Sequence, residues 1–297
     1  MIELPRNIDL ENPEFLQAWN LIRHTHQSVF LTGKAGTGKS TFLKYICKQT
    51  KKKHIVLAPT GIAAMNVGGV TLHSFFQIPT RPIPPDDADY SLSRIKRKLK
   101  LSKEKIKLIK AVELLIIDEI SMVRPDIIDF IDRVLRSYSD NKKEPFGGKQ
   151  LLLVGDIFQL EPVITPDTRN ILSHYYPNFF FFNAKVYNSV DLISIELKKI
   201  YRQQDDKFIK ILDRIRINQA STDDLQIINT RFCNLDTINN DSFTITLASR
   251  RDIVDNINTR NLEVLPGDEY TFKGEINGDF PDKLLPTDRD LILKENA

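Results

Sequence analysis

The chain has 297 residues, the length of about two domains at roughly 150 residues each. Its 41% hydrophobic and 27% charged residues are typical of a globular protein and exclude wholesale disorder. No apolar run reaches the roughly 18 residues of a membrane span, and the N-terminus lacks the basic start and apolar core of a secretion signal. The two cysteines stand alone, which excludes a disulfide scaffold and predicts an intracellular, reduced protein.

The net charge of +3 is small but unevenly distributed. Segment 94–110 contains nine Lys or Arg residues and one Glu, whereas the rest of the chain is net acidic. A local cluster of this kind is typical of a surface that meets a polyanion. The alternative is a solvated helix face, with Ile95, Leu99, Ile106 and Ile109 as its apolar stripe. On this run alone, both interpretations stay open.

Short apolar runs bounded by turn signals recur along the first part of the chain. They lie at 28–32, 54–58, 112–118 and 150–156. Because the runs do not alternate with polar residues, they indicate strands covered on both faces, as in a parallel sheet with crossover helices. Ser40–Gln49 has helical periodicity, and the Pro- and Asp-rich segment 80–89 predicts a connector to the basic insertion. The expected fold class is therefore α/β.

A new series of elements begins at about residue 191. Segments 191–197 and 244–248 are expected to be strands, and 207–217 is expected to be a helix. The series predicts a second α/β domain. The last residues, from 291, have the pattern of a strand that begins there, so we expect a truncated chain.

Segment Gly33–Ser40 fits G-x-x-x-x-G-K-[ST] in full and lies between an expected strand and an expected helix. Glycines let backbone N–H groups surround phosphate oxygens, and the helix N-terminus adds the positive end of its dipole. Lys39 places an ammonium on the terminal phosphates, and Ser40 offers a hydroxyl to Mg²⁺. The predicted nucleotide-binding residues are Gly33, Ala35, Gly36, Thr37, Gly38, Lys39, Ser40 and Thr41.

Four further side chains carry the chemistry of hydrolysis. Asp118 ends an apolar run and is expected to hold Mg²⁺, and the adjacent Glu119 is expected to activate water. Gln159, after the next apolar run, is either a contact to the water and leaving phosphate or an ordinary loop residue. Arg202, across an expected cleft, either stabilises the charge of the transition state or forms a surface ion pair.

Together these segments resemble the PIF (petite integration frequency) family of DNA helicases, in superfamily 1B. The matching stretches are FLTGKAGTGKST, APTGIAAMNVGGVTLHSFF, LLIIDEISMVRPDIIDFIDRVLRS, PFGGKQLLLVGDIFQLEPV and LKKIYRQQDDKFIKILDRIR. TITLASRRDIVDNINTRNL resembles the start of the family's second domain. The resemblance implies a P-loop NTPase of RecA-like fold. It also implies ATP- and Mg²⁺-dependent translocation 5′-to-3′ on single-stranded DNA, with unwinding of duplexes, junctions or G-quadruplexes.

The resemblance also assigns roles to individual residues. It implies the same roles as above for the phosphate-loop residues Lys39 and Ser40 and for the two carboxylates, Asp118 and Glu119. It implies that Gln159 is the phosphate sensor and that Arg202 is the arginine finger. A looser match implies that Gln17 reads the adenine base. The residues implied to line the DNA channel are Thr60, Gly61, Asn66, Thr71, His73 and Ser74. Phe75 and Phe76 are either stacking surfaces for bases or core residues.

The resemblance implies three parts: residues 1–78 and 105–190 as the ATP-binding domain, 79–104 as an inserted wedge, and 191–297 as part of a second RecA-like domain. The family's last motifs are not visible, so we expect a fragment, or a remainder on another chain, that binds nucleotide but unwinds poorly. A monomer in the cytoplasm or nucleoid is expected, or in the nucleus or mitochondrion of a eukaryote, with roles in DNA repair, recombination and telomere maintenance. A small-molecule kinase and a non-catalytic nucleotide switch are the rival interpretations.

Overall fold

The computed structural model describes residues 8–201, 205–233, 245–276, 287–295 and 297. The chain divides into two compact units, residues 1–225 and 226–297. The first unit contains the phosphate-loop sequence and all of the expected DNA-contact residues.

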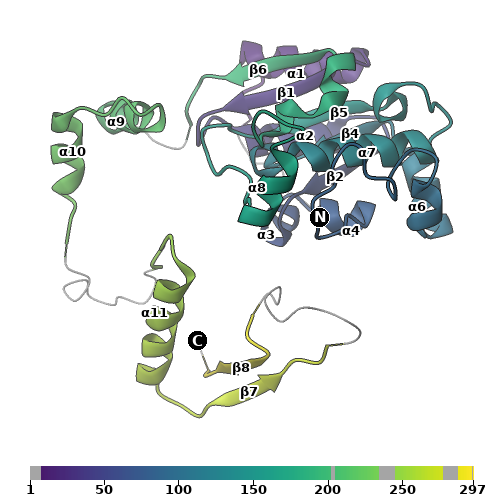
Figure 1. The fold of residues 1–297 in the computed structure, drawn as a ribbon. Coiled ribbons are helices and arrows are strands. Elements are labelled where there is room, and N and C mark those ends of the chain that lie inside the picture. The colour runs from purple at the N-terminus through teal and green to yellow at the C-terminus, as the bar shows by residue number, and fades with distance from the viewer. Residues whose placement is uncertain (1–7, 202–204, 234–244, 277–286, 296) are drawn as a thin grey trace. The chain divides into compact units, whose positions relative to one another are not determined.

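The first unit is built on a parallel sheet of six strands in the order β3-β2-β4-β5-β1-β6 (Figure 1). Its strands are β1 Ser28–Gly33, β2 His54–Ala58, β3 Val70–Thr71, β4 Leu114–Ile117, β5 Gln150–Val154 and β6 Leu192–Leu197. Four of these coincide with the four apolar runs of the sequence, so the expected α/β fold with a parallel sheet is confirmed. β4 and β5 are buried along their whole length, which explains why their sequences do not alternate.

Helices cover both faces of this sheet. The helices that precede β6 are α1 Pro13–His24, α2 Lys39–Gln49, α3 Gly61–Asn66, α4 Leu72–Phe76, α5 Ile95–Lys98, α6 Lys103–Ala111, α7 Pro125–Tyr138 and α8 Pro166–Leu172. Two more, α9 Asp206–Arg216 and α10 Thr222–Asn229, follow β6 and do not cover the sheet. Short 3₁₀ helices lie at Ile120–Met122, Pro145–Gly148, Phe181–Asn183 and Lys185–Ser189. None of the helices in the described ranges combines the length and hydropathy that a membrane crossing requires.

Two separate hydrophobic clusters pack against the two faces. Along β4, Leu114 and Ile116 belong to the cluster formed with α1 and α2. Leu115 and Ile117 belong to the cluster formed with α4, α7 and the insertion between residues 78 and 101. Successive residues of a strand point to opposite faces, so a continuous apolar run is what a sheet covered on both sides requires.

Strand β6 differs from the expected domain boundary at residue 191. It pairs in parallel with β1, from Ser28 opposite Leu192 to Gly33 opposite Leu197, and so extends the first sheet. Its side chains Ile195 and Leu197 complete the cluster under α1 and α2. Segment 191–197 therefore belongs to the sheet of the first unit, because the edge of β1 offers it a ladder of hydrogen bonds.

The second unit contains helix α11 Arg251–Val264 and an antiparallel pair, β7 Tyr270–Lys273 with β8 Asp290–Leu293. Strand β8 confirms the strand expected from residue 291. The strand expected at 244–248 is wrong for the described residues 245–248, which form no strand. Ile245 and Leu247 are 84% and 92% exposed, so no neighbour buries this apolar run. The assignment of the later residues to a second RecA-like domain stays a prediction.

Candidate active site

The phosphate loop connects the end of β1 to the start of α2. Gly33 has φ of +151°, and a Cβ atom there would lie 2.6 Å from the Thr37 Oγ1 and 2.7 Å from the Leu197 carbonyl oxygen. Gly38 has φ of +92° and stands at the N-cap of α2, with no side-chain cap on the first N–H groups of the helix. Glycine is therefore required at Gly33 by space and at Gly38 by backbone conformation, and the uncapped N–H groups are available to an anion.

Lys39 bends back over this loop. Its Nζ donates to the carbonyl oxygens of Gly33 and Lys34, at 2.5 and 3.0 Å. Burial lowers the pKa of Lys39, and the nearby carboxylates of Asp156 and Glu119 oppose that shift. An ammonium held by loop carbonyls beside the helix N-terminus is placed to meet a phosphate.

A cavity of about 420 Å³ opens over the loop. The expected nucleotide residues from Ala35 to Thr41 line it, together with Glu119 and Gln159. Gln17 is exposed on α1 and does not line this cavity, and its expected role as adenine reader stays a prediction. The remaining lining residues are Ile8, Asp9, Asn12, Phe15, Leu197 and Tyr201.

Asp9, Asn12 and Tyr201 form a wall of this cavity that the sequence did not reveal. The Tyr201 hydroxyl donates to the Asp9 Oδ2 at 2.9 Å and accepts from the Asn12 Nδ2 at 3.4 Å. The backbone N–H of Tyr201 donates to the Gly36 carbonyl oxygen at 2.8 Å. Asn12 is the N-cap of α1, where its side chain accepts from the Phe15 N–H, and local sequence can indicate such a cap. Local sequence cannot indicate its contact with Tyr201, which lies 189 residues away.

The two adjacent acidic residues after β4 take different environments. Asp118 is 8% exposed, and burial raises its pKa to about 6. Glu119 lines the cavity with its backbone in the left-handed region, at φ of 50°. A non-glycine residue in that region stores strain, a feature that clusters at functional sites.

Gln159 follows β5 and also lines the cavity. Its Nε2 donates to the Asp156 Oδ2 at 3.3 Å. Asp156 is 1% exposed and forms an ion pair with Arg216 of α9. Arg202 lies outside the described residues, so its expected role stays a prediction.

The expected DNA-contact residues gather on α3, α4 and the strand between them. Thr60 and Thr71 are the N-caps of α3 and α4, and their side chains accept from the Ala63 and Ser74 N–H groups, each at 3.2 Å. The other members of the set, Gly61, Asn66, His73 and Ser74, are exposed. Their role in DNA contact stays a prediction.

Two aromatic residues next to this set have a settled environment. Phe75 and Phe76 are 6% and 0% exposed, and their rings meet edge to face with centroids 4.8 Å apart. They belong to the cluster under α7. Of the two interpretations offered by the sequence, the core one holds for both residues.

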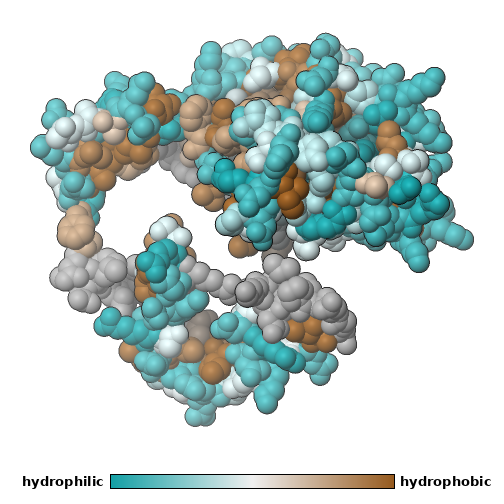
Figure 2. Space-filling model, viewed as in Figure 1, coloured by the Kyte–Doolittle hydropathy of each residue, from teal (hydrophilic) through white to brown (hydrophobic). Residues whose placement is uncertain are grey.

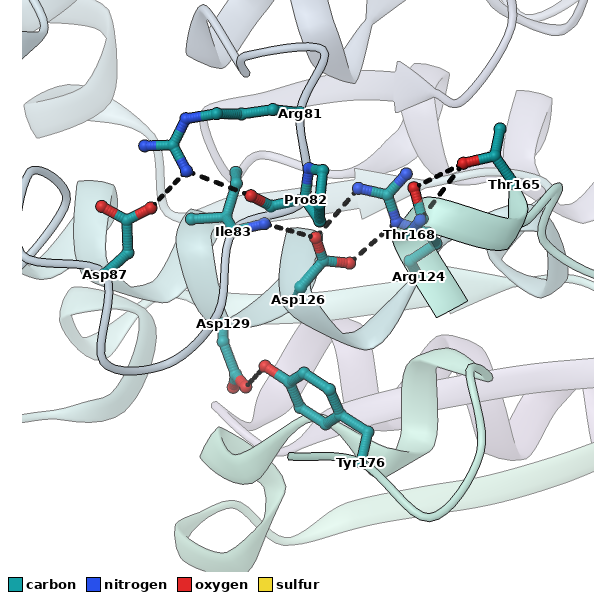
Figure 3. A network of polar contacts seen from close by, with 10 residues as sticks. All are labelled: Arg81, Pro82, Ile83, Asp87, Arg124, Asp126, Asp129, Thr165, Thr168 and Tyr176. Carbon is teal, nitrogen blue, oxygen red and sulfur yellow. Dashed lines mark hydrogen bonds and ion pairs between the residues drawn. The ribbon is translucent and has the colours of Figure 1, made fainter. Parts of the chain in front are cut away.

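The basic insertion is fixed to the first unit. Ile95 and Leu99 are buried in the α7 cluster, whereas the Lys and Arg side chains around them face solvent. Figure 3 shows how α7 holds the segment that leads into it: Asp126, fully buried, accepts from the Ile83 N–H at 3.1 Å and forms two hydrogen bonds with Arg124, both at 2.9 Å. The positive charge of the insertion is therefore carried by a segment that is packed against α7.

Comparison with known proteins decides the family. The sequence model described as "PIF1-like helicase" matches residues 15–225. The chain belongs to this family. That range contains the phosphate loop, the two carboxylates, Gln159 and the anchored insertion. The resemblance stated from the motifs is thereby confirmed.

Relatives of the family are similar over most of this chain. The ATP-dependent DNA helicase RRM3 of Saccharomyces cerevisiae is 34% identical over 288 residues, which are 94% of this chain and 38% of that protein. The human ATP-dependent DNA helicase PIF1 is 33% identical over 250 residues, 83% of this chain and 36% of that one. The chain thus spans less than half the length of these relatives.

Solved structures of Pif1 helicases share the fold. The crystal structure of Bacteroides Pif1 bound to ssDNA superposes with a TM-score of 0.83 at 42% identity, covering 99% of this chain and 64% of that one. The structure of Bacteroides Pif1 with ADP-AlF3 and ssDNA has a TM-score of 0.82 at the same identity and coverage. The expected RecA-like P-loop fold is confirmed by this likeness.

Proposed function

We propose that this chain is the nucleotide-hydrolysing part of an ATP-dependent DNA helicase. The protein moves 5′-to-3′ on single-stranded DNA and opens duplexes, junctions or G-quadruplexes. The observation that carries the proposal is one cavity in which the phosphate loop, Glu119 and Gln159 meet. The named relatives are ATP-dependent DNA helicases, which agrees with this assignment.

ATP enters this cavity with its phosphates on the loop. The N–H groups at the start of α2 and the Lys39 ammonium bind the terminal phosphates. Asn12 and Tyr201 stand on the same cavity wall and are placed to meet the base. The family resemblance implied this contact for Gln17, which does not line the cavity.

The oxygen ligands present suit Mg²⁺. Mg²⁺ is usually held by one or two protein oxygens, substrate phosphates and water. The Ser40 hydroxyl lines the cavity, and Asp118 lies close enough to Lys39 for their charges to interact. When bound, the ion neutralises charge on the phosphates.

The hydrolysis step uses the remaining polar groups. Glu119 accepts a proton from the attacking water, and Gln159 orients that water against the terminal phosphate. Arg202 stabilises the charge of the transition state from the segment that follows Tyr201. An arginine in this role accelerates phosphoryl transfer by about 10³–10⁵.

DNA lies on the surface formed by α3, α4 and the basic insertion. The exposed hydroxyls, N–H groups and lysines there bind phosphates without reading sequence. We propose that the protein acts as a monomer inside the cell, in the nucleus or mitochondrion if its source is a eukaryote. Roles in repair, recombination and telomere maintenance belong to the same proposal.

The decisive measurement is ATP turnover with and without single-stranded DNA. We expect stimulation by DNA that weakens with salt, at a slope of about −0.7 per phosphate contacted on a log–log plot. An ATP turnover rate that depends on neither DNA nor salt contradicts the helicase proposal and favours a small-molecule kinase.

Glu119→Gln tests the catalytic role separately. The variant keeps the side-chain volume but cannot accept a proton, so we expect unchanged ATP binding and at least a hundredfold slower turnover, within the about 10²–10⁴ of general-base catalysis. Unchanged turnover removes the base role from Glu119.

A further inference from the structure

Helix α9 reaches both loops that build the nucleotide cavity. Asp213 pairs with Lys34 of the phosphate loop, Oδ2 to Nζ at 2.6 Å. Arg216 pairs with Asp156 in the loop after β5, Nη2 to Oδ1 at 2.7 Å and Nε to Oδ2 at 3.2 Å. Residues three apart on a helix share one face, so a single face of α9 contacts both loops.

The apolar side chains of α9 are unevenly buried. Ile211 is the buried hydrophobic residue of this helix, at 1% exposure. Leu212 and Ile215 are 44% and 40% exposed, and Figure 2 shows hydrophobic side chains on the surface along α9 and α10. The two ion pairs therefore hold this face of α9 to both loops, in addition to the packing of Ile211.

The Arg216–Asp156 ion pair is connected to the cavity through Gln159. Asp156 accepts from Arg216 and, through the same Oδ2, from the Nε2 of Gln159. Burial alone would raise the pKa of Asp156, but Arg216 holds it below its usual value, so the carboxylate stays charged. One hydrogen of the Gln159 Nε2 is held on that carboxylate, which orients the side chain and leaves the second Nε2 hydrogen able to donate to a phosphate oxygen. The Arg216 guanidinium also lies 4.2 Å over the Phe158 ring, which limits its movement.

We propose that Arg216 is a positioning residue for the nucleotide site, acting on the terminal phosphate through Asp156 and Gln159. Asp213 supports the same docking through Lys34. Recognition of the terminal phosphate then requires α9 in place, which links the chain beyond Tyr201 to the state of the nucleotide. This inference rests on the proposed function in one respect: it takes ATP as the ligand.

The test compares two arginines of the same helix. Arg214 also forms a bidentate ion pair, with Asp224, and its side-chain partners among the described residues include no residue of the phosphate loop or of the loop after β5. We measure the affinity of the 297-residue chain for Mg·ADP and for Mg·ADP with aluminium fluoride, which occupies the terminal phosphate position. For Arg216→Ala we expect about a tenfold loss of affinity for the aluminium fluoride complex, and less than a threefold loss for ADP. For Arg214→Ala we expect both affinities unchanged.

Two further variants make the test specific. In the double variant Arg216→Ala/Gln159→Ala, the loss should be no larger than in Gln159→Ala alone, because both changes interrupt one path. Arg216→Lys keeps a positive charge beside the buried carboxylate of Asp156, so this variant should fold even if Arg216→Ala does not. A lysine ammonium cannot bind both carboxylate oxygens of Asp156 as the guanidinium does, so we expect a three- to tenfold loss of affinity for the aluminium fluoride complex.

Three results overturn the proposal: equal losses for both ligands, effects of Arg216 and Gln159 that multiply, or an Arg214 variant as impaired as Arg216→Ala. The measurement needs neither DNA nor turnover. Failure of the DNA-stimulated hydrolysis assay therefore leaves this inference standing. A selective loss in Arg216→Ala likewise does not establish a helicase.

Discussion

Asp118 and Glu119 are adjacent in the chain but lie in two different environments. The left-handed backbone of Glu119 turns the chain sharply after β4, and the turn is closed by the Met122 N–H donating to the Glu119 carbonyl oxygen at 3.1 Å. One carboxylate is thereby buried beside the sheet while the next lines the cavity. Adjacent acids in different environments can serve as metal ligand and base at the same pH.

The burial of Asp118 predicts a pH-dependent gain in stability for Asp118→Asn. The pKa of Asp118 is raised to about 6, above the value of 3.8 for an exposed carboxyl. Between these values the folded state holds more protons than the unfolded state, so stability falls as pH rises through this window. Above pH 6 the cost is complete, about 3 kcal/mol at most. Because the amide carries no charge, we expect the variant to be more stable than the original protein in urea unfolding at pH 8 without Mg²⁺.

At pH 5 this advantage should shrink, because Asp118 is then largely protonated in the folded protein. A constant difference between pH 5 and pH 8 would contradict burial as its source. Nucleotide binding in the presence of Mg²⁺ should move in the opposite direction and weaken in the variant.

At the scale of elements, α7 organises the first unit. Its Asp126 holds Ile83, its Arg133 donates to the Pro85 carbonyl oxygen at 3.4 Å, and its Tyr138 hydroxyl donates to the Leu99 carbonyl oxygen at 2.7 Å. Asp129, on the next turn, accepts from the Tyr176 hydroxyl at 2.7 Å (Figure 3). Successive turns of one helix thus fix the insertion on one side and the segment after β5 on the other.

Asp126→Ala is expected to destabilise the protein by about 3–5 kcal/mol, because it leaves the Arg124 charge and the Ile83 N–H without their buried partner. Urea unfolding of the 297-residue chain measures this. The matched control is Asp89→Ala, since Asp89 pairs with Lys98 at 3.1 Å but both side chains are about half exposed. The control should cost less than about 0.5 kcal/mol. Equal effects of the two variants would show that the Asp126 network is not structurally important.

At the scale of the molecule, the sequence predicted what depends on local pattern. The strands 28–33 and 54–58 and the phosphate loop are set by runs of neighbouring residues, and all three lie where expected. The pairing of β6 with β1 was not predictable, because the edge strand of a sheet is chosen by a partner far away in sequence. The same holds for Tyr201 and Arg216, whose contacts join residues that no local spacing relates.

The basic insertion gives a prediction for the whole protein. Lys100, Lys103 and Lys107 are exposed on the basic segment 94–110, so replacing them with Ala should weaken binding of single-stranded DNA and lower the salt slope by about 0.7 for each DNA phosphate that is no longer bound. The control replaces Lys48 and Lys51, also exposed, at the end of α2 on the other face of the sheet. Fluorescence anisotropy of labelled oligonucleotides measures both. Equal reductions in affinity per lysine removed would indicate attraction by net charge alone.

The position of β6 has a mechanical consequence. This strand ends at Leu197, and four residues later the Tyr201 N–H is bonded to the Gly36 carbonyl oxygen. Only three residues therefore separate the end of β6 from the residue that is bonded to the phosphate loop. A displacement of the loop by an ångström has to move the backbone that follows it, so a short insertion of glycines between Leu197 and Tyr201 would release that backbone while leaving every residue of the cavity unchanged.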